Sequence, residues 1–394
     1  MLSARGTAWT KYGYLHGKEN TYDPVKNPKG DVILTNAFNW FILEDLTKFM
    51  NSHHGLDKSL FTYGEGYTGT LRLRSAMANH LNRHFHPAQT IDAEEITFTA
   101  GVTNINEVCA SVTCDPGEAI MLGRPIYGSF SEDFVMRTGV NLEYVSVGDT
   151  DQFSPDCIAG YEAGFEDAKA RGVNIRALVI CNPHNPIGQC YPRETLVALV
   201  RFCASKGIHL ISDEIYALSV YGQEGDELES FTSLRTIDTS GIIDPSQVHI
   251  LHGMSKDYAA AGLRLGCVIT QNQEFSKAVR AICRFSSPSQ LSMDLAAKFL
   301  EDEAFVDEFL KNNAGLFVWL DLSRHLDLDE VNGDEWEAEK KLSQRFTRAG
   351  VIMDTGGEYR APRAGRFRLM FTVEEGTLRE GIKRISAVLT EKRG

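Results

Sequence analysis

The sequence predicts an α/β fold in which helices cover a mostly parallel central sheet in a large domain, with a smaller α+β domain beside it. From about residue 95, short apolar runs alternate with helix-like segments, an order that produces parallel strands. The chain has 394 residues, more than one ordinary hydrophobic core accommodates. We therefore expect an N-terminal arm with part of the small domain over 1–45, a large domain over 46–310 and a C-terminal small domain over 311–394.

Composition excludes several classes of function. A formal net charge of −13, with no compensating basic block, argues against binding to nucleic-acid phosphates. The eight cysteines form no C-x-x-C pair and mostly lie in apolar surroundings, which indicates reduced core residues and no metal site. Neither a signal peptide nor a run of about 18 apolar residues is present. We expect a cytoplasmic protein with no membrane partner.

The first 30 residues are polar and rich in Gly, Pro and Asn, which predicts an extended arm. Helices are expected up to about Met50 and over Thr70–Phe85. The segment between them carries Gly64, Gly66 and Gly69 in the pattern G-x-G-x-x-G. A dinucleotide-binding loop needs a preceding strand and an acidic residue about 20 positions later. The sequence offers neither convincingly, so this interpretation is disfavoured.

Seven apolar runs are the expected strands of the large domain: 96–99, 119–122, 142–147, 177–181, 209–216, 248–251 and 267–270. Helices are expected after residue 101, over 155–172, over 273–283, and from a Ser-Pro break to residue 301. A single long helix is expected over 303–321. The last segment, 335–394, predicts a helix, strands at 351–353 and 366–371, and a terminal helix.

Several side chains that can carry chemistry follow these strands. Lys256 comes after the run 248–251, and a lysine held at a strand end can lose its proton and act as a Schiff-base nucleophile. Arg264 offers a fixed guanidinium suited to a phosphate. Asp213 follows a buried run, where an unpaired carboxylate is expensive and a cation would compensate it. Taken alone, a surface lysine beside a structural arginine explains Lys256 as well.

Two further stretches point to a ligand site. The loop 182–188 has two Asn-Pro steps and a Gly, so it turns sharply at a strand's carboxyl end, where open α/β sheets bind ligands. Residues 100–107 run from a strand into a helix, and the free amides around Val102 and Thr103 would suit a phosphate. The second signal is weak by itself.

The stretch Ser255-Lys256-Asp257, followed by Gly262-Leu263-Arg264-Leu265-Gly266, resembles the lysine motif of class I aminotransferases that use pyridoxal 5'-phosphate (PLP). Its form is similar to that of 1-aminocyclopropane-1-carboxylate (ACC) synthases and their fungal relatives. The resemblance runs from about Tyr22 to the C-terminal helix. It implies the PLP-dependent transferase fold type I and the cofactor PLP.

The resemblance also implies roles for individual residues. Lys256, Asp213 and Tyr216 would be catalytic: Lys256 binds PLP covalently and moves the Cα proton, Asp213 keeps the PLP ring protonated, and Tyr216 holds the phenolate oxygen. The remaining cofactor contacts would come from Val102, Thr103, Tyr127, Asn185, Ser255, Arg264 and, across a homodimer interface with shared active sites, Tyr67 of the second copy. Arg368 would bind the carboxylate of an amino-acid substrate, with Phe38 and Asn185 beside the substrate.

Two positions depart from the pattern. Where ACC synthases have Ala-Glu-Asn, this chain has Ala37-Phe38-Asn39, so the substrate-facing carboxylate is missing. Gly253 stands where many aminotransferases have a phosphate-binding serine. We expect an aminotransferase that deprotonates an α-amino acid at Cα. The alternative is an ACC synthase-like carbon–sulfur lyase of secondary metabolism, acting by β- or γ-elimination. A catalytically inactive binding protein is disfavoured by the intact Lys256, Asp213 and Arg368.

Overall fold

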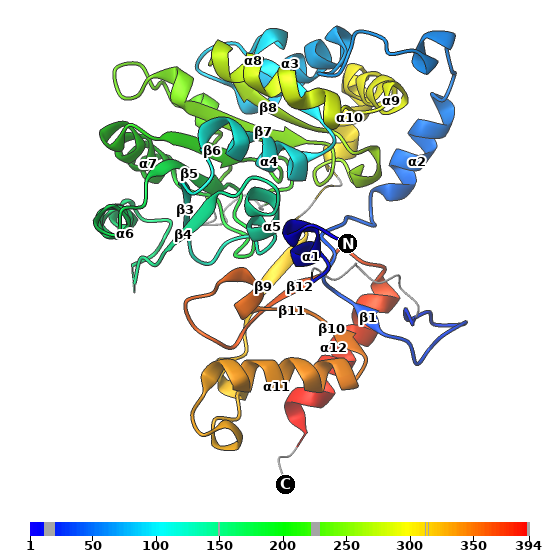
Figure 1. The fold of residues 1–394 in the computed structure, drawn as a ribbon. Helices are drawn as coiled ribbons and strands as arrows, with labels where there is room; N and C mark the ends of the chain where they lie inside the picture. Colours follow the sequence, from blue (N-terminus) through cyan, green and yellow to red (C-terminus); the bar gives the residue numbers. More distant parts are fainter. Residues whose placement is uncertain (12–19, 149, 222–228, 312, 314, 392–394) are drawn as a thin grey trace. The chain divides into compact units, whose positions relative to one another are not determined.

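The computed structural model describes residues 1–11, 20–148, 150–221, 229–311, 313 and 315–391 (Figure 1). The chain folds into two compact units. The larger comprises Ala37–Val318 and Tyr359–Pro362, and the smaller comprises Met1–Asn36, Trp319–Glu358 and Arg363–Gly394. Each unit therefore takes residues from separate parts of the sequence.

The larger unit is built on a seven-stranded sheet of order β2-β8-β7-β6-β5-β3-β4 (Figure 1). Its strands are β2 (Ile96–Thr99), β3 (Ala119–Gly123), β4 (Asn141–Val145), β5 (Ile175–Cys181), β6 (His209–Asp213), β7 (Val248–Gly253) and β8 (Gly266–Thr270). Strands β3 to β7 pair in parallel, whereas β8 is antiparallel to both β7 and β2. The β7–β8 connection contains only a short 3-10 turn at Ala261–Leu263 and no crossover α-helix, which agrees with the antiparallel return of β8. The mostly parallel sheet confirms the predicted fold class.

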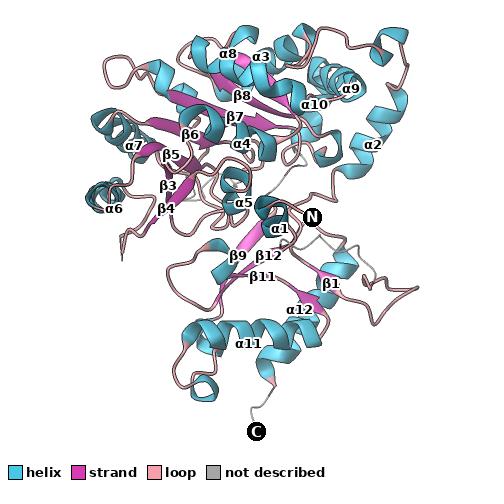
Figure 2. Cartoon of the chain, in the orientation of Figure 1, coloured by secondary structure: helices cyan, strands magenta, loops and turns pink. Residues whose placement is uncertain are grey.

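Helices cover this sheet (Figure 2). They are α2 (Leu43–Ser52), α3 (Leu71–Phe85), α4 (Val102–Thr113), α5 (Phe130–Val135), α6 (Ile158–Ala170), α7 (Arg193–Lys206), α8 (Gln273–Ile282), α9 (Gln290–Glu301) and α10 (Glu303–Lys311). Helix α4 contacts β7 and β8, α6 contacts β4 and β5, and α7 contacts β6. Helix α3 begins as predicted, because the Thr70 side chain accepts a hydrogen bond from the Leu73 amide at 3.2 Å.

The predicted helix over 303–321 is wrong in its second half. Helix α10 ends at Lys311, and Phe317–Asp321 form strand β9. Asn313 is buried, and its Nδ2 donates to the Leu218 carbonyl at 2.9 Å and to Ser219 Oγ at 3.1 Å. This anchoring ends the helix, and the β-branched and aromatic residues after Gly315 favour a strand.

The expected extended arm is also wrong at its start, where Ala4–Trp9 form helix α1. The Ser3 hydroxyl caps this helix by accepting a hydrogen bond from the Gly6 amide at 3.0 Å. None of its residues is buried, so local capping rather than packing specifies it.

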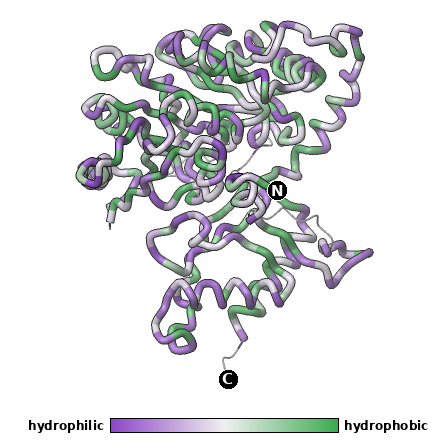
Figure 3. The backbone as a smooth tube through the Cα atoms, viewed as in Figure 1, coloured by the Kyte–Doolittle hydropathy of each residue, from purple (hydrophilic) through white to green (hydrophobic). Residues whose placement is uncertain are grey.

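The smaller unit contains a three-stranded sheet of order β11-β12-β9 and the parallel pair β1–β10. Its elements include β1 (Val32–Ile33), β10 (Val351–Ile352), β11 (Asp354–Thr355), β12 (Arg366–Met370), α11 (Glu335–Arg348) and α12 (Glu375–Thr390). Most residues of α11 are hydrophilic (Figure 3), and the few apolar ones include Ala338, Leu342 and Phe346. Its apolar side is buried, with Phe346 packing edge-on against Phe367 of β12 at 5.6 Å between ring centroids.

All eight cysteines are buried and free, which confirms that they are core residues. Within the described ranges, no helix is both long and apolar enough to cross a lipid bilayer.

Candidate functional site

Lys256 lies in the β7–β8 connection of the larger unit, at the carboxyl end of β7. Its Nζ donates to the Ala37 carbonyl at 2.8 Å. Arg264 ends the same connection with a positive φ of 54°, and its guanidinium donates to the Ala261 carbonyl at 3.1 Å and the Ala100 carbonyl at 3.3 Å. One short loop therefore brings an ammonium and a guanidinium to the sheet's ligand-binding edge.

Glycines allow the close packing around this loop. A Cβ on Gly266 would lie 2.4 Å from the Val102 amide nitrogen, and one on Gly101 would lie 2.6 Å from Arg264 Nη2. A Cβ on Gly253 would lie 2.6 Å from the Leu265 carbonyl oxygen. A serine at position 253 would therefore force the backbone to shift, which explains why this chain lacks that hydroxyl.

Helix α4 starts directly after Gly101, whose φ is 92°. Its first turn leaves amide groups without partners inside the helix, and the helix dipole adds positive charge there. The side chains of Val102 and Thr103 line a cavity together with Ser255 and Arg264. This end of the cavity has the chemistry of a phosphate site.

Asp213 ends β6 and is 5% exposed, and its Oδ1 accepts from the Ile215 amide at 3.2 Å. Burial raises the pKa of Asp213 to about 7; the charge of Asp133 raises it further, whereas the Ile215 amide and Lys256 lower it. The predicted strand over 209–216 therefore ends earlier, because the chain turns at this carboxylate. Asn185 Nδ2 donates to the Tyr216 hydroxyl at 3.5 Å from the neighbouring loop.

These side chains line one cavity of about 140 Å³. Of the predicted cofactor-binding residues, it includes Val102, Thr103, Tyr127, Asn185, Asp213, Tyr216, Ser255, Lys256 and Arg264. It also includes residues that the sequence did not single out: Asn106, Asp133, Cys181, Ile215 and Ala261. The cavity therefore has a cationic end, an aromatic ring and a carboxylate. These fit, in that order, the phosphate, the ring and the basic ring nitrogen of PLP.

Three predicted residues lie outside this lining. Tyr67 is 38% exposed, and its ring lies edge-on to the Tyr63 ring with 6.5 Å between the ring centroids. Phe38 is half-buried and packs edge-on against Trp40 at 5.4 Å between ring centroids. Arg368 belongs to the smaller unit, where its Nη2 donates to Asp354 Oδ2 and to the Thr35 carbonyl, each at 2.6 Å.

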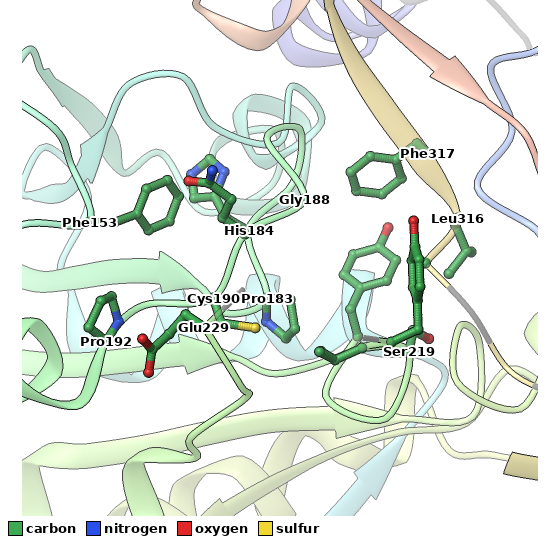
Figure 4. Close-up of a pocket in the computed structure, with 15 residues that line it drawn as sticks. Phe153, Pro183, His184, Gly188, Cys190, Pro192, Ser219, Glu229, Leu316 and Phe317 are labelled. Atoms are coloured by element: carbon green, nitrogen blue, oxygen red, sulfur yellow. The ribbon is translucent and has the colours of Figure 1, made fainter. Parts of the chain in front are cut away.

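A larger cavity of about 320 Å³ adjoins the first, with Tyr216 lining both. Phe153 and His184 lie on one side of it and Phe317 on the other (Figure 4). The Phe317 ring packs edge-on against the Tyr216 ring, with 5.7 Å between the ring centroids, and this contact helps to hold the Tyr216 ring in place. His184 is buried beside Phe153, so it packs inside the loop 182–188 rather than at its surface.

Glu214, next to Asp213, faces away from the cavity. It is fully buried and accepts from Ser233 Oγ at 2.6 Å and the Leu234 amide at 3.0 Å. Burial raises the pKa of Glu214 to about 7, so the folded chain keeps a proton there that the unfolded chain releases near pH 4.5.

Glu214→Gln is expected to make the cofactor-free chain relatively more stable as pH rises. In the wild type, the stability contributed by protonated Glu214 is complete below pH 4.5 and is lost as pH rises through 7. The variant has no such loss, so its unfolding free energy relative to wild type should increase by roughly 2–3 kcal/mol between pH 4.5 and 7.5. Urea denaturation at several pH values measures this difference. A difference that does not change with pH contradicts the prediction.

Comparison with known proteins decides the family. Residues 35–314 match the family of class I and II aminotransferases. The chain belongs to this family. Its enzymes depend on PLP, so the predicted family and class of enzyme are confirmed.

Among curated relatives of this aminotransferase chain is an ACC synthase of Oryza sativa, 30% identical over 395 residues, which cover 89% of this chain and 71% of the relative. A probable aminotransferase of Aspergillus fumigatus is 30% identical over 395 residues, covering 91% of this chain and 89% of the relative. Both support the predicted ACC synthase-like subgroup.

Solved aminotransferases share the fold. An aromatic aminotransferase from Pyrococcus horikoshii superposes with a TM-score of 0.71 at 21% identity, covering 93% of this chain and 97% of that one. An aspartate aminotransferase from Thermus thermophilus gives 0.67 at 20% identity, covering 91% of each chain. The predicted fold type I is confirmed.

Proposed function

We propose that this chain is an aminotransferase that binds PLP and removes the Cα proton of an α-amino acid. The observation that carries the proposal is that one cavity is lined by Lys256, Asp213, the Asn185–Tyr216 pair and the phosphate-type end at α4. When bound, PLP supplies an electron sink for the electrons released at Cα.

Lys256 would hold the cofactor covalently and, once displaced by the substrate amine, carry the proton to and from Cα. Asp213, buried at the end of β6, would hold the proton on the ring nitrogen. Asn185 and Tyr216, which already touch each other at 3.5 Å, would hold the ring's phenolate oxygen.

The remaining lining residues would hold the other parts of the cofactor. Ser255, Arg264, Thr103 and the amide of Val102 surround the phosphate-type end of the cavity. Tyr127 offers an aromatic face that would stack on the ring.

Arg368 would bind the substrate carboxylate, with Asn185 as a second donor. A guanidinium and a carboxylate pair through two parallel hydrogen bonds, which would orient the Cα–H bond for transfer to Lys256. Asp354 accepts from Arg368 Nε at 3.1 Å and from Nη2 at 2.6 Å. This pair keeps the guanidinium plane fixed for a ligand.

A second candidate is a carbon–sulfur lyase of secondary metabolism, which would use the same Cα deprotonation. It is favoured by the similarity to ACC synthases at 30% identity. A screen of amino acids that assays keto acid, ammonia and released thiol together separates the two. Keto acid formed only with a keto-acid acceptor supports the aminotransferase, whereas ammonia or thiol without an acceptor supports the lyase.

The chain is expected to make no ACC from S-adenosylmethionine. Phe38 stands where the ACC synthases carry a carboxylate. An aromatic face attracts a sulfonium cation less strongly than a carboxylate that forms an ion pair with it. An uncharged or apolar amino acid suits Phe38 better. Incubation with S-adenosylmethionine, followed by measurement of ACC and methylthioadenosine, tests this. Catalytic ACC formation would show that the missing carboxylate does not determine specificity.

We also propose a cytoplasmic homodimer with shared active sites. Exposed apolar side chains near Tyr67 support a second copy as the partner: Leu56, Phe61, Tyr63, Leu71, Phe285 and Leu291. Gln290 Nε2 donates to the Tyr63 carbonyl at 3.0 Å, so the segments 56–71 and 285–291 lie together. Tyr67 would reach from this surface to the partner's cofactor phosphate.

At a PLP concentration that leaves the Tyr67→Phe homodimer mostly without cofactor, mixing a Lys256→Ala chain with a Tyr67→Phe chain is expected to restore activity that neither homodimer has in full. If sites are shared, a heterodimer has one site with both changes and one with neither, so it should reach about half the wild-type activity per dimer. Tyr67→Phe alone should weaken PLP binding by about tenfold, the effect of losing one hydrogen bond to a charged group. Verified heterodimers without recovery would contradict the crossing of Tyr67.

A further inference from the structure

The cavity has a second carboxylate beside Asp213. Asp133, on α5, lines the same cavity as Asp213 and is partly buried. Its Oδ2 accepts a hydrogen bond from Asn106 Nδ2 at 3.0 Å. Asn106 lies on α4, lines the cavity too and is only 1% exposed. Three elements, α4, α5 and β6, thus each bring a polar side chain to the lining of this cavity.

This end of the cavity is short of positive charge. In the described part of the chain, Asp133 forms no ion pair, and Asn106 Oδ1 is buried without a hydrogen-bond partner. Burial raises the pKa of Asp133 to about 7, with Glu132 raising it further and Asn106 lowering it. Asp133 in turn raises the pKa of Asp213, which Lys256 only partly offsets. Two carboxyls that line one cavity, of which Asp133 raises the proton affinity of Asp213, favour either a proton or a cation near them.

We propose that Asp133 is a positioning residue that, with Asp213, forms a two-carboxylate end selective for a ring that carries a proton on its nitrogen. Asn106 holds the Asp133 carboxylate in place. The inference rests on the proposed binding of PLP and assigns to Asp133 a part that neither the sequence pattern nor the lysine motif indicates. Asp213 meets the ring nitrogen, and Asp133 acts on it through its charge.

The arrangement has a consequence for ligand choice. A protonated heteroaromatic ring neutralises one of the two charges as it enters. A ring of the same shape with carbon in place of the nitrogen cannot do so, and the two carboxyls must then take up a proton from solvent. The cavity should therefore bind PLP more tightly than its 1-deaza analogue, and Asp133 should supply part of that difference.

The test is to measure the dissociation constants of PLP and of its 1-deaza analogue for the wild type and Asp133→Asn. The variant is expected to bind PLP about tenfold more weakly while its affinity for the deaza analogue is unchanged or increased. Asp213→Asn should lower the same preference by a larger factor. Glu274→Gln, which removes an exposed carboxylate of α8 that does not line the cavity, should leave the preference unchanged.

The outcomes separate the two proposals. Equal losses for both ligands in Asp133→Asn would show a purely structural role and overturn the inference, while wild-type binding of PLP upholds the cofactor. A wild type that binds no PLP would overturn the proposed function and, with it, this inference. If Asp133→Asn does not fold, Asn106→Ala releases the Asp133 carboxylate and should reduce the preference in the same direction; an unchanged preference there would count against the proposal.

Discussion

Lys256→Ala is expected to abolish covalent attachment of PLP and to lower kcat by on the order of 10⁴-fold. The variant loses the nitrogen that binds the cofactor and also the group that carries the Cα proton, and proton transfer by a positioned side chain alone contributes up to about 10⁴-fold. In the wild type, borohydride reduction followed by peptide mass spectrometry should find the reduced cofactor on Lys256. The protein should be yellow before reduction and lose that absorption afterwards.

Lys277→Ala is the matched control. Lys277 is exposed on α8 and pairs only with the neighbouring Glu274, at 2.6 Å, among the contacts described for it. This variant should bind PLP and react with borohydride as the wild type does. A reduced adduct on any lysine other than Lys256 would refute the assignment of the cofactor lysine.

The residues that the sequence identified share a physical signature. Asp213 and the loop with Asn185 directly follow an apolar run, and Lys256 comes a few residues after one. The carboxyl ends of parallel strands meet at one edge of the sheet. The same logic recovered the seven strands of the larger unit, but it did not predict helices α5 and α7. Polar residues at strand ends can be predicted because the apolar run of a buried strand is the strongest local signal in the sequence.

The sequence could not identify Asp133 and Asn106 for the opposite reason. Both lie within helices, and Asp133 follows Ser131 and Glu132 in a stretch that is typical of a solvated helix face. Only the packing of α5 against α4 brings Asp133 to Asn106 and both to the cavity. Non-local contacts of this kind leave no periodic mark in either helix.

The same limit explains the misassigned strand β9. The spacing of Phe309, Leu316 and Trp319 is compatible with a helix, but the buried hydrogen bonds of Asn313 to the segment 218–219 end α10. These bonds join residues far apart in the sequence, so tertiary contacts override the local pattern. Gly253 is a similar case, since only the approach of the Leu265 carbonyl shows why a serine is absent.

Asp213→Asn is expected to leave PLP bound but to slow exchange of the substrate's Cα–H by on the order of 10²- to 10³-fold. Asp213 is buried and already favours a nearby positive charge, so its carboxylate would hold a proton on the ring nitrogen. A neutral amide cannot do so, and the loss of such a preorganised charge in a dry site costs a factor of this order. Solvent deuterium incorporation at Cα, followed by NMR, measures the exchange directly.

Glu214→Gln provides the control for Asp213→Asn. Glu214 is the adjacent residue, equally buried, and its pKa is also raised to about 7, but its carboxylate bonds Ser233 and Leu234 instead of lining the cavity. The substitution replaces a buried carboxyl group of the same kind at a position that does not line the cavity. The rate of Cα–H exchange in Glu214→Gln should therefore stay within about threefold of wild type. A threefold change in rate corresponds to only a fraction of the roughly 1.4 kcal/mol of activation free energy that a tenfold change requires. Near-normal exchange in Asp213→Asn, or equal slowing in both variants, would mean that Asp213 does not hold the ring proton.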